Sequence, residues 1–401
     1  MDNKKNGIPK LRFPGFTGAW EQRKLGEVAD IVGGGTPSTK VKEYWNGNIN
    51  WYSPIEIGTS IYASESVKKI TQLGLEKSSA KLLPKGTVLF TSRAGIGNTA
   101  ILMKEATTNQ GFQSIVPKKG VLNSYFIFTE TPFLKRYGEI NGAGSTFVEV
   151  SGKQMSKMPL LLPSFDEQLK IGNFFKQLDH LITLHQRKLE HLQEQKKGLL
   201  QKMFPKNGET VPEVRFPGFT DAWEQRKLGE ILKERKERSS IGELISVTIN
   251  NGVVKADSLE RKDNSSSDKS NYKVVCKGDI AYNSMRMWQG ASGYSPYNGI
   301  LSPAYTVLIP TEKVDSKFIS YMFKKEKMLQ QFQKYSQGLT SDTWNLKYPM
   351  LKDIPVLFPK IDEQVSIRKH LDNISSLIAL HQRKLDHLEL MKKGLLQQMF
   401  V

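Results

Sequence analysis

The chain has 401 residues, with 58 lysines and arginines against 40 aspartates and glutamates, and one cysteine, Cys276. The formal net charge of +18 favours a polyanionic partner such as nucleic acid, or an acidic protein. A single thiol excludes an internal disulfide and a cysteine-rich zinc site. No apolar run approaches the roughly 18 residues of a membrane span, and the N-terminus lacks a signal-peptide core. We therefore expect a cytoplasmic protein of two or three domains with no membrane partner.

The first element in chain order is a segment that occurs twice. Residues 11–27 read LRFPGFTGAWEQRKLGE and residues 214–230 read VRFPGFTDAWEQRKLGE, so the two copies differ at only two positions. A repeat unit of about 200 residues is the size of a domain rather than of a solenoid repeat. The sequence therefore predicts a duplicated half-molecule.

A variable region follows each copy, at about 28–162 and 231–358, and the two regions have no comparable identity. Each contains short β-rich runs bounded by Gly, Pro or Asn, and one stretch of helical pattern. Strands are predicted at 87–91, 114–116, 279–282 and 305–309, and helices at 124–138 and 316–335. We expect two α+β modules with irregular sheets and long loops, where recognition residues usually lie.

Each variable region is followed by a block that predicts a long helix. Residues 163–204 and 359–400 match in sequence, and both carry apolar residues at heptad spacing, so the two helices are expected to pack on each other. Two ordinary core helices are the alternative, although helices of this length are uncommon in compact domains. The predicted seam residues are Phe175, Leu178, Ile182, His185, Leu189, Leu192, Leu199, Leu371, Ile374, Ile378, His381, Leu385, Leu388 and Leu395.

Polar residues interrupt the seam at the same places in both blocks. His185 matches His381, and Lys196 matches Lys392. Polar seam residues fix register and partner choice at a cost in stability. We interpret the histidines as such a register device rather than as a metal pair, and expect no metal site.

These elements predict an α+β fold. Two modules related by a pseudo-two-fold axis are separated by two long helices that form an antiparallel coiled coil. The predicted domains are a first module at 1–162, a first helix at 163–204, a second module at 205–358 and a second helix at 359–401. A duplicated frame suits two copies of one partner, whereas divergent modules suit two different targets.

The sequence contains no recognisable catalytic motif. It has no phosphate-binding G-x-x-x-x-G-K-[ST] loop, no G-x-S-x-G, no H-E-x-x-H and no Pro-Pro pair such as an adenine methyltransferase motif needs. The nearest acidic cluster, Asp257 and Glu260 beside Lys262, has the composition of a surface loop. These absences favour a binding protein. A stand-alone DNA-modifying or DNA-cleaving enzyme and a basic coiled-coil scaffold that binds only proteins remain as alternatives.

Basic residues alternate with amides and aromatics in four segments of the modules, at 91–98, 108–114, 282–290 and 337–345. Arginine reads guanine and the amides read adenine in the major groove, while other basic residues hold phosphates. For any single residue, a core or ion-pairing role is the stronger alternative. The candidate DNA contacts are Ser92, Arg93, Asn98, Gln110, Gln113, Asn283, Arg286, Trp288, Gln289 and Thr343.

The chain resembles the specificity subunit of Type I restriction–modification enzymes. The resemblance rests on the two FPGFT-x-AWEQRKLGE segments, the two dissimilar modules and the two helices ending in KKGLLQ-x-MF. It also rests on GGGTPST at 33–39 in the first module and on KGDIAYN at 277–283 in the second.

That resemblance implies a non-catalytic subunit that binds double-stranded DNA. Each module would read one half of an asymmetric, bipartite target, and the paired helices would set the spacing and dock two modification subunits. Those partners, together with restriction subunits, would supply S-adenosylmethionine, ATP and Mg²⁺ chemistry, so no cofactor is expected in this chain.

Overall fold

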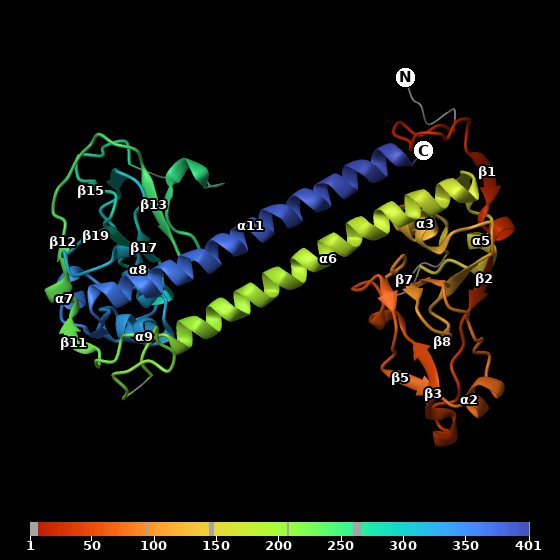
Figure 1. Ribbon diagram of the computed structural model, residues 1–401, viewed down its shortest axis with the longest axis horizontal. Helices are drawn as coiled ribbons and strands as arrows, with labels where there is room; N and C mark the ends of the chain where they lie inside the picture. The colour runs from red at the N-terminus through yellow and green to blue at the C-terminus, as the bar shows by residue number, and fades with distance from the viewer. Residues whose placement is uncertain (1–6, 94, 144–147, 207, 260–265, 401) are drawn as a thin grey trace. The chain divides into compact units, whose positions relative to one another are not determined.

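The computed structural model describes the whole chain except residues 1–6, 94, 144–147, 207, 260–265 and 401 (Figure 1). The chain forms two compact units, one from Met1–Gln186 with Arg383–Val401 and the other from Arg187–Gln382. Unit 1 thus contains the first module, the first half of one long helix and the end of the other. Unit 2 contains the second module and the complementary helix segments. The domain limits drawn from the sequence stay a prediction.

Unit 1 is built around two small sheets. A five-stranded sheet has the order β2-β9-β6-β7-β4, and a three-stranded sheet has the order β5-β3-β8. Helices α3 and α4 lie between the last sheet strand and the final segment of the module. The elements are β1 (Glu21–Lys24), α1 (Leu25–Val28), β2 (Ala29–Gly33), β3 (Trp45–Tyr52), β4 (Tyr62–Ala63), β5 (Lys68–Ile70), α2 (Gln72–Glu76), β6 (Val88–Phe90), β7 (Thr99–Leu102), β8 (Ala106–Thr108), β9 (Gln113–Pro117), α3 (Ser124–Thr129), α4 (Thr131–Asn141), α5 (Gly152–Ser156) and β10 (Pro159–Leu162).

Unit 2 has a four-stranded sheet of order β12-β19-β16-β17 and the two-stranded sheets β13-β14 and β15-β18. Its module helices, α8 and α9, follow the last strand of the large sheet, as α3 and α4 do in unit 1. The elements are β11 (Glu224–Lys227), α7 (Leu228–Ile231), β12 (Leu232–Glu234), β13 (Ile245–Thr248), β14 (Gly252–Lys255), β15 (Lys273–Val275), β16 (Ile280–Asn283), β17 (Ser292–Tyr294), β18 (Gly299–Leu301), β19 (Tyr305–Pro310), α8 (Ser316–Phe323), α9 (Glu326–Tyr335), α10 (Tyr348–Leu351) and β20 (Pro355–Phe358).

The repeated segments form the same frame in both units. β1 pairs with β10 and β11 pairs with β20, each antiparallel, which ties the start of each module to its end. Arg12 donates two hydrogen bonds to Glu167 at 2.7 and 2.8 Å, and Arg215 donates two to Glu363 at 2.6 and 2.8 Å. Bidentate pairs of this kind fix geometry as well as contributing energy. The identical sequence therefore folds identically twice.

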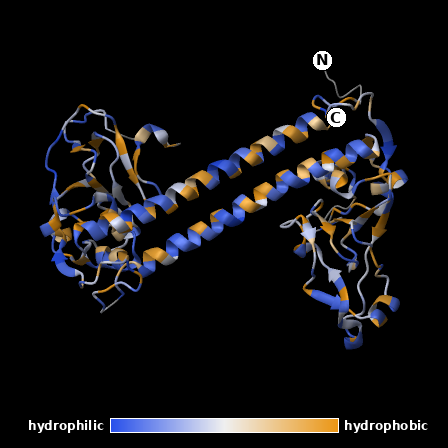
Figure 2. Cartoon of the chain, in the orientation of Figure 1, coloured by the Kyte–Doolittle hydropathy of each residue, from blue (hydrophilic) through white to orange (hydrophobic). Residues whose placement is uncertain are grey.

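The two long helices are α6 (Phe165–Lys202) and α11 (Ile361–Met399). Acidic residues in the first turn of each, such as Asp166 and Asp362, complement the positive end of the helix dipole. Pro205 follows the end of α6, where a proline cannot continue a helix. Figure 2 shows apolar residues at intervals along both helices among hydrophilic ones.

In unit 1 the end of α11 packs against the start of α6. Phe175 of α6 contacts Phe400, with ring centroids 6.1 Å apart, and Lys392 pairs with Asp179 of α6 at 2.6 Å. The order of these contacts shows that the two helix segments run in opposite directions within the unit.

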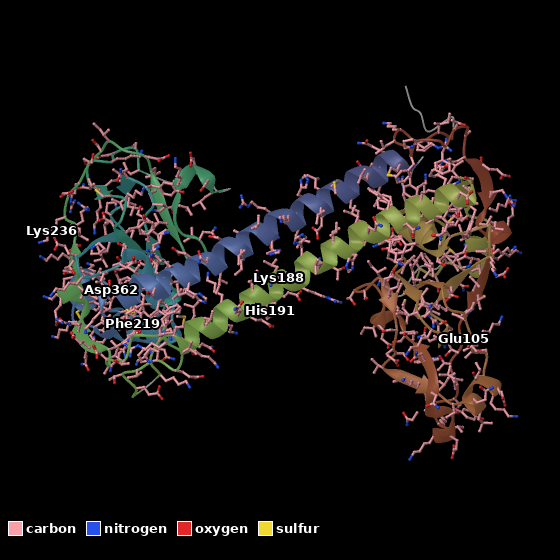
Figure 3. All side chains as sticks on the ribbon, viewed as in Figure 1. Glu105, Lys188, His191, Phe219, Lys236 and Asp362 are labelled. Atoms are coloured by element: carbon pink, nitrogen blue, oxygen red, sulfur yellow. The ribbon has the colours of Figure 1, made fainter. Side chains whose placement is uncertain are left out.

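The part of α6 that belongs to unit 2 also carries exposed side chains. In Figure 3 the side chains of Lys188 and His191 stand out from α6, and both are exposed.

Both units draw the helix ends into their main hydrophobic cores. In unit 1 the core includes Phe175 and Leu178 from α6 and Met399 from α11. In unit 2 it includes Leu371 from α11 together with Met203, which follows α6. Each module core is thus completed by the helix that ends there, and truncation of either helix end would open a core.

The structure confirms the four predicted strands, which lie within or overlap β6, β9, β16 and β19. The predicted helices are each broken in two. Residues 124–138 become α3 and α4, with the break at Glu130 before Pro132, and residues 316–335 become α8 and α9, with the break at Lys324–Lys325. A proline favours the first turn of a new helix, which explains the break in unit 1. Among the described residues, no helix is long and apolar enough to cross a bilayer.

Candidate nucleic-acid interface

The loop at residues 91–98 connects β6 to β7 in the first module. Thr91 holds it closed, because its Oγ1 donates to Gly95 O at 2.7 Å and accepts from Asn98 N at 2.9 Å. Gly97 adopts a φ of +95°, and a Cβ there would lie 2.4 Å from the Lys135 side chain on α4. Glycine is therefore required at position 97, where the backbone lies directly against α4.

Two further segments lie beside this loop. Ser92 N donates to Gly111 O at 2.8 Å, and Val150 N donates to Ser92 O at 3.1 Å. Arg93 lies 3.8 Å from Glu149, whose carboxylate comes from the segment between α4 and α5. The described residues of three segments, 91–93 with 95–98, 108–114 and 148–150, therefore form one cluster, called loop cluster 1 below.

The first-module candidates occupy different places in and beside loop cluster 1. The Ser92 side chain is fully buried, and its hydroxyl has no hydrogen-bond partner among the described residues. Arg93 is 39% exposed and Asn98 is exposed. Gln110 is exposed and accepts a hydrogen bond from Thr36 Oγ1, while Gln113 lies on β9, half-buried next to Gly152. Arg93, Asn98 and Gln110 are thus the three that present side chains to solvent.

The second module repeats this arrangement with different residues. The segment 283–291 connects β16 to β17, and Leu346 N donates to Ser284 O at 2.8 Å, as Val150 does to Ser92 in unit 1. A hairpin at 337–345 is closed by mutual backbone hydrogen bonds between Gln337 and Asn345, at 3.1 and 2.8 Å. The segments 283–291, 302–306 and 337–345 are called loop cluster 2 below.

The aromatic side chains of loop cluster 2 pack on each other. Trp288 and Trp344 meet edge to face with ring centroids 5.1 Å apart. Asn283 Oδ1 accepts from Met285 N at 3.0 Å, so this amide supports the loop. Arg286 is exposed and makes no side-chain hydrogen bond or ion pair with a described residue, and the half-buried Gln289 lies nearby in sequence. Arg286 is therefore the cation of this cluster that is most available to a ligand.

Thr343, the last candidate, is exposed in the hairpin, where its Oγ1 donates to Thr340 O at 2.9 Å. Leu339 at the tip of the same hairpin is fully exposed. The hairpin is thus preorganised by its own hydrogen bonds and presents both polar and apolar groups.

A half-buried lysine fixes loop cluster 2 to the module helices. Lys324, between α8 and α9, donates to the carbonyls of Gly290 and of Ile249, the second at 2.7 Å. Burial lowers the pKa of Lys324 to about 8. Sequence reasoning missed this residue, and it also missed Glu149 as the partner of Arg93. The segment 337–345 of cluster 2 was among the predicted candidates, whereas residues 148–150 of cluster 1 were not; their position after α4 was the available signal.

The described residues contain no group of three His, Cys, Asp or Glu side chains placed to hold a metal ion. Each cluster combines an arginine with amides and hydroxyls, and the arginine is half-buried in cluster 1 and exposed in cluster 2. Such groups can hydrogen-bond to base edges and phosphates. The chemistry available at both clusters is therefore that of recognition.

Comparison with known proteins agrees with this arrangement. The family model described as Type I restriction modification DNA specificity domain matches residues 18–194 and 220–390. The Type I restriction enzyme MjaIX specificity subunit of Methanocaldococcus jannaschii is 36% identical over 223 residues, which cover 53% of this chain and 52% of that protein. In that match, the chain spans about half the length of its relative.

Two longer matches cover nearly the whole chain. The MjaVIII specificity subunit of the same organism is 21% identical over 94% of this chain and 91% of that protein. The crystal structure of the Type I restriction–modification S subunit from M. genitalium superposes with a TM-score of 0.61 at 15% identity, covering 98% of this chain and 99% of that one. Since two copies of the family model together match most of the residues, the chain belongs to the Type I restriction–modification DNA specificity family.

Proposed function

We propose that this chain is the non-catalytic DNA-recognition subunit of a Type I restriction–modification complex and acts in the cytoplasm. Loop cluster 1 reads one half of a bipartite DNA target and loop cluster 2 reads the other. The observation that carries this proposal is the contrast between the identical frame and the different loop clusters. Equivalent backbone hydrogen bonds, Val150 to Ser92 and Leu346 to Ser284, position unrelated side chains, so each module offers a different set of contacts.

The charge supports a DNA partner. With a net charge of +18, phosphate contacts would supply affinity that falls steeply with salt. Half-buried Arg93 and exposed Arg286 are the best candidates for direct base contacts in clusters 1 and 2. Specific sites of this kind are typically favoured over random DNA by about 4–10 kcal/mol.

The long helices would set the distance between the half-sites. We propose that α6 and α11 form an antiparallel coiled coil along their length, with the predicted seam residues between them. The opposed packing of helix segments in unit 1, at Phe175 with Phe400 and Asp179 with Lys392, supports this. A helix adds about 1.5 Å per residue, so inserted turns would move one module along the duplex.

The same helices would dock two modification subunits. Leu181 and Leu184 of α6 are 43% and 53% exposed, and their repeat equivalents, Leu377 and Leu380 of α11, are 43% and 38% exposed. An exposed leucine pair that occurs once in each unit suits two copies of one partner helix. S-adenosylmethionine, ATP and Mg²⁺ would be bound by the partner subunits.

The test is selection of DNA from a random pool by the complex of this chain with modification subunit. A split motif is expected, and exchange of residues 231–358 for another second module is expected to change one half only. Insertion of four residues within 190–210 is expected to lengthen the spacer while both half-sequences persist. Changes in both halves after the exchange, or an unchanged spacer after the insertion, would contradict the proposal.

The alternatives make different predictions. A stand-alone enzyme would cleave or modify DNA without any partner. A scaffold that binds only proteins would select no sequence from the pool, although its weak binding to DNA would still fall with salt. Assays of the purified chain alone and of its complex with modification subunit together decide among the three.

A further inference from the structure

The end of each long helix meets the junction between the two module helices, but the two units use opposite charges there. In unit 2 the residue that precedes α9 is Lys325, and in unit 1 the residue that precedes α4 is Glu130. Each is the N-cap residue of its helix. This reversal occurs between the module helices, at residues that belong to neither loop cluster 1 nor loop cluster 2.

Lys325 shows what the junction between the module helices can bind. Its ammonium group donates to Leu200 O at 2.9 Å and lies 4.6 Å from the centre of the Phe204 ring. The carbonyl belongs to the last turn of α6, at the negative end of the helix dipole. A carbonyl at a helix C-terminus and an aromatic face both attract cations.

Unit 1 has the same carbonyl and the same aromatic ring at this place but no lysine beside them. Leu396 and Phe400 are the repeat equivalents of Leu200 and Phe204, and both line a cavity of about 1130 Å³ in unit 1. The corresponding cavity of unit 2, next to Lys325, measures about 330 Å³. The space is thus larger in the unit that lacks the lysine.

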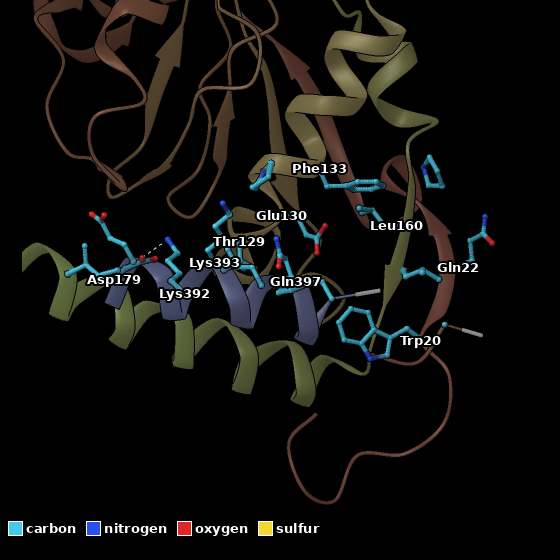
Figure 4. A pocket seen from close by; sticks show the side chains of 18 residues that line it. Trp20, Gln22, Thr129, Glu130, Phe133, Leu160, Asp179, Lys392, Lys393 and Gln397 are labelled. Atoms are coloured by element: carbon cyan, nitrogen blue, oxygen red, sulfur yellow. Dashed lines mark ion pairs between the residues drawn. The ribbon is translucent and has the colours of Figure 1, made fainter. Parts of the chain in front are cut away.

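Glu130 lines the unit 1 cavity (Figure 4), and its carboxyl group makes no hydrogen bond or ion pair with a described residue. Burial raises the pKa of Glu130 to about 8. The other acidic groups at the cavity are Asp179 and Glu389, and the basic ones are Lys392 and Lys393. Lys392 is held by Asp179 at 2.6 Å, so it does not neutralise Glu130.

The remaining wall of the cavity is mostly apolar, with the polar side chains of Gln22, Thr129 and Gln397 among its lining residues. Trp20, Phe133 and Leu160 line it together with Leu396 and Phe400, and Figure 4 shows Trp20, Phe133 and Leu160 around the same space as Glu130. Trp20 is 4% exposed, and its indole N–H has no partner among the described residues. Such a wall suits an aliphatic chain that ends in a cation.

The geometry points to a binding site in unit 1 for a lysine side chain supplied by a partner protein, with its ammonium group at Glu130, Leu396 O and the Phe400 ring. The partner assigned to it is the modification subunit, an assignment that rests on the proposed function. Lys325 is the internal counterpart of that lysine in unit 2. The two units would therefore hold their partner copies differently, since only unit 1 has the vacant cation site.

The site itself is tested with n-butylammonium chloride, which has the length and charge of a lysine side chain. Ligand-observed saturation-transfer NMR on the full chain measures binding at pH 6 and pH 8.5. Wild-type protein is expected to bind more tightly at pH 8.5, because the Glu130 carboxyl releases its proton to solvent when the cation binds. Glu130→Gln should weaken binding about tenfold, the loss of one charge-assisted hydrogen bond, and Glu130→Lys should abolish it.

Glu139→Gln is the matched control, because Glu139 is an exposed carboxylate on α4 outside the cavity. It should bind the probe as wild type does, and unfolding midpoints establish that each variant is folded. Equal binding by wild type and Glu130→Lys, or no binding by wild type at pH 8.5, would overturn the site.

The source of the lysine is tested by the dissociation constant of purified modification subunit. Glu130→Gln is expected to weaken the binding of one of the two modification subunits about tenfold. Glu139→Gln is expected to weaken the binding of neither. If wild type and Glu130→Gln bind the probe differently but the modification subunit equally, the assigned partner is wrong. If wild type binds the probe but no modification subunit at all, the docking part of the proposed function fails, and the partner assigned to this site fails with it.

Discussion

Two lysines at the same position of the repeat provide a sharp test of how the helix ends are held. Lys392 of α11 lies 2.6 Å from Asp179, a carboxylate that is 5% exposed and that also accepts a hydrogen bond from Tyr125 at 2.7 Å. Lys196 of α6 instead lies 5.5 Å from the centre of the Tyr321 ring, and burial lowers its pKa. We expect the change of each lysine to methionine, which keeps the length and apolar body of the side chain, to have different effects.

The magnitude follows from what each substitution leaves behind. Lys392→Met leaves the buried Asp179 charge without its cation. Breaking a buried pair costs about 3–5 kcal/mol, and because Lys392 is 29% exposed we expect about 2–3 kcal/mol. Lys196→Met removes a partly buried cation. The carboxylate that interacts with this cation, Asp372, keeps its ion pair with Lys317, at 3.3 Å. The cost of Lys196→Met should therefore stay within about 1 kcal/mol.

The assay is urea unfolding of the full chain, with hydrogen exchange to assign the loss to a unit. Lys392→Met should lower protection in residues 165–186 and 383–399, which belong to unit 1. Asp179→Asn combined with Lys392→Met should cost less than the sum of the two single changes, because the pair is lost once. Equal destabilisation by Lys392→Met and Lys196→Met would refute this reasoning.

Three other outcomes are expected. Because burial raises the folded-state pKa of Glu130 to about 8, its carboxyl destabilises the fold increasingly as the pH rises from about 4.5 to about 8. Glu130→Gln should therefore match wild type below pH 4.5 and be more stable than wild type above pH 8, by on the order of a few kcal/mol. Thermal unfolding at pH 4 and pH 8.5 that shows no such difference would contradict this prediction. Gly97→Ala should cost about 1–3 kcal/mol, since both its φ and the Lys135 side chain oppose a Cβ. Gly95→Ala has a φ of +102°, but its Cβ would make only an ordinary contact with Asn98 at 3.9 Å, so it should cost less when both are measured by urea unfolding. Arg286→Ala should weaken binding to DNA about tenfold to a hundredfold, and only through the half-site that loop cluster 2 reads. The assay is fluorescence anisotropy with DNA in which each half-site is scrambled in turn. A loss of affinity that depends on the first half-site would contradict this prediction.

Much of the frame could be predicted from the sequence because it is written twice. The repeated segments and heptads predicted long helices, and the structure places α6 at Phe165–Lys202 and α11 at Ile361–Met399. The pattern did not predict that each module helix breaks in two. Glu130 and Lys325 fall inside stretches of helical periodicity. Pro132 is a sequence signal for the break in unit 1, whereas no proline marks the break at Lys324–Lys325, where tertiary packing decides where one helix ends.

The candidate contacts were harder to predict, since residue type does not reveal burial. Ser92 has the composition of a loop residue, yet its backbone bonds to Gly111 and Val150 on either side, and this pairing buries its side chain. Trp288 packs on Trp344, which lies more than fifty residues later in the chain. Such contacts depend on two loops meeting in space, and no local pattern carries that information.

Single-molecule sequencing of DNA modification in the host, with and without this gene, tests the central claim most directly. The account predicts that one split motif loses its methylated adenines when the gene is deleted, and regains them when the wild-type chain is restored. Restoring a chain with another module at 231–358 should yield a motif that shares one half with the original. Methylation that is unchanged by the deletion, in a host with active modification subunits, would contradict the account.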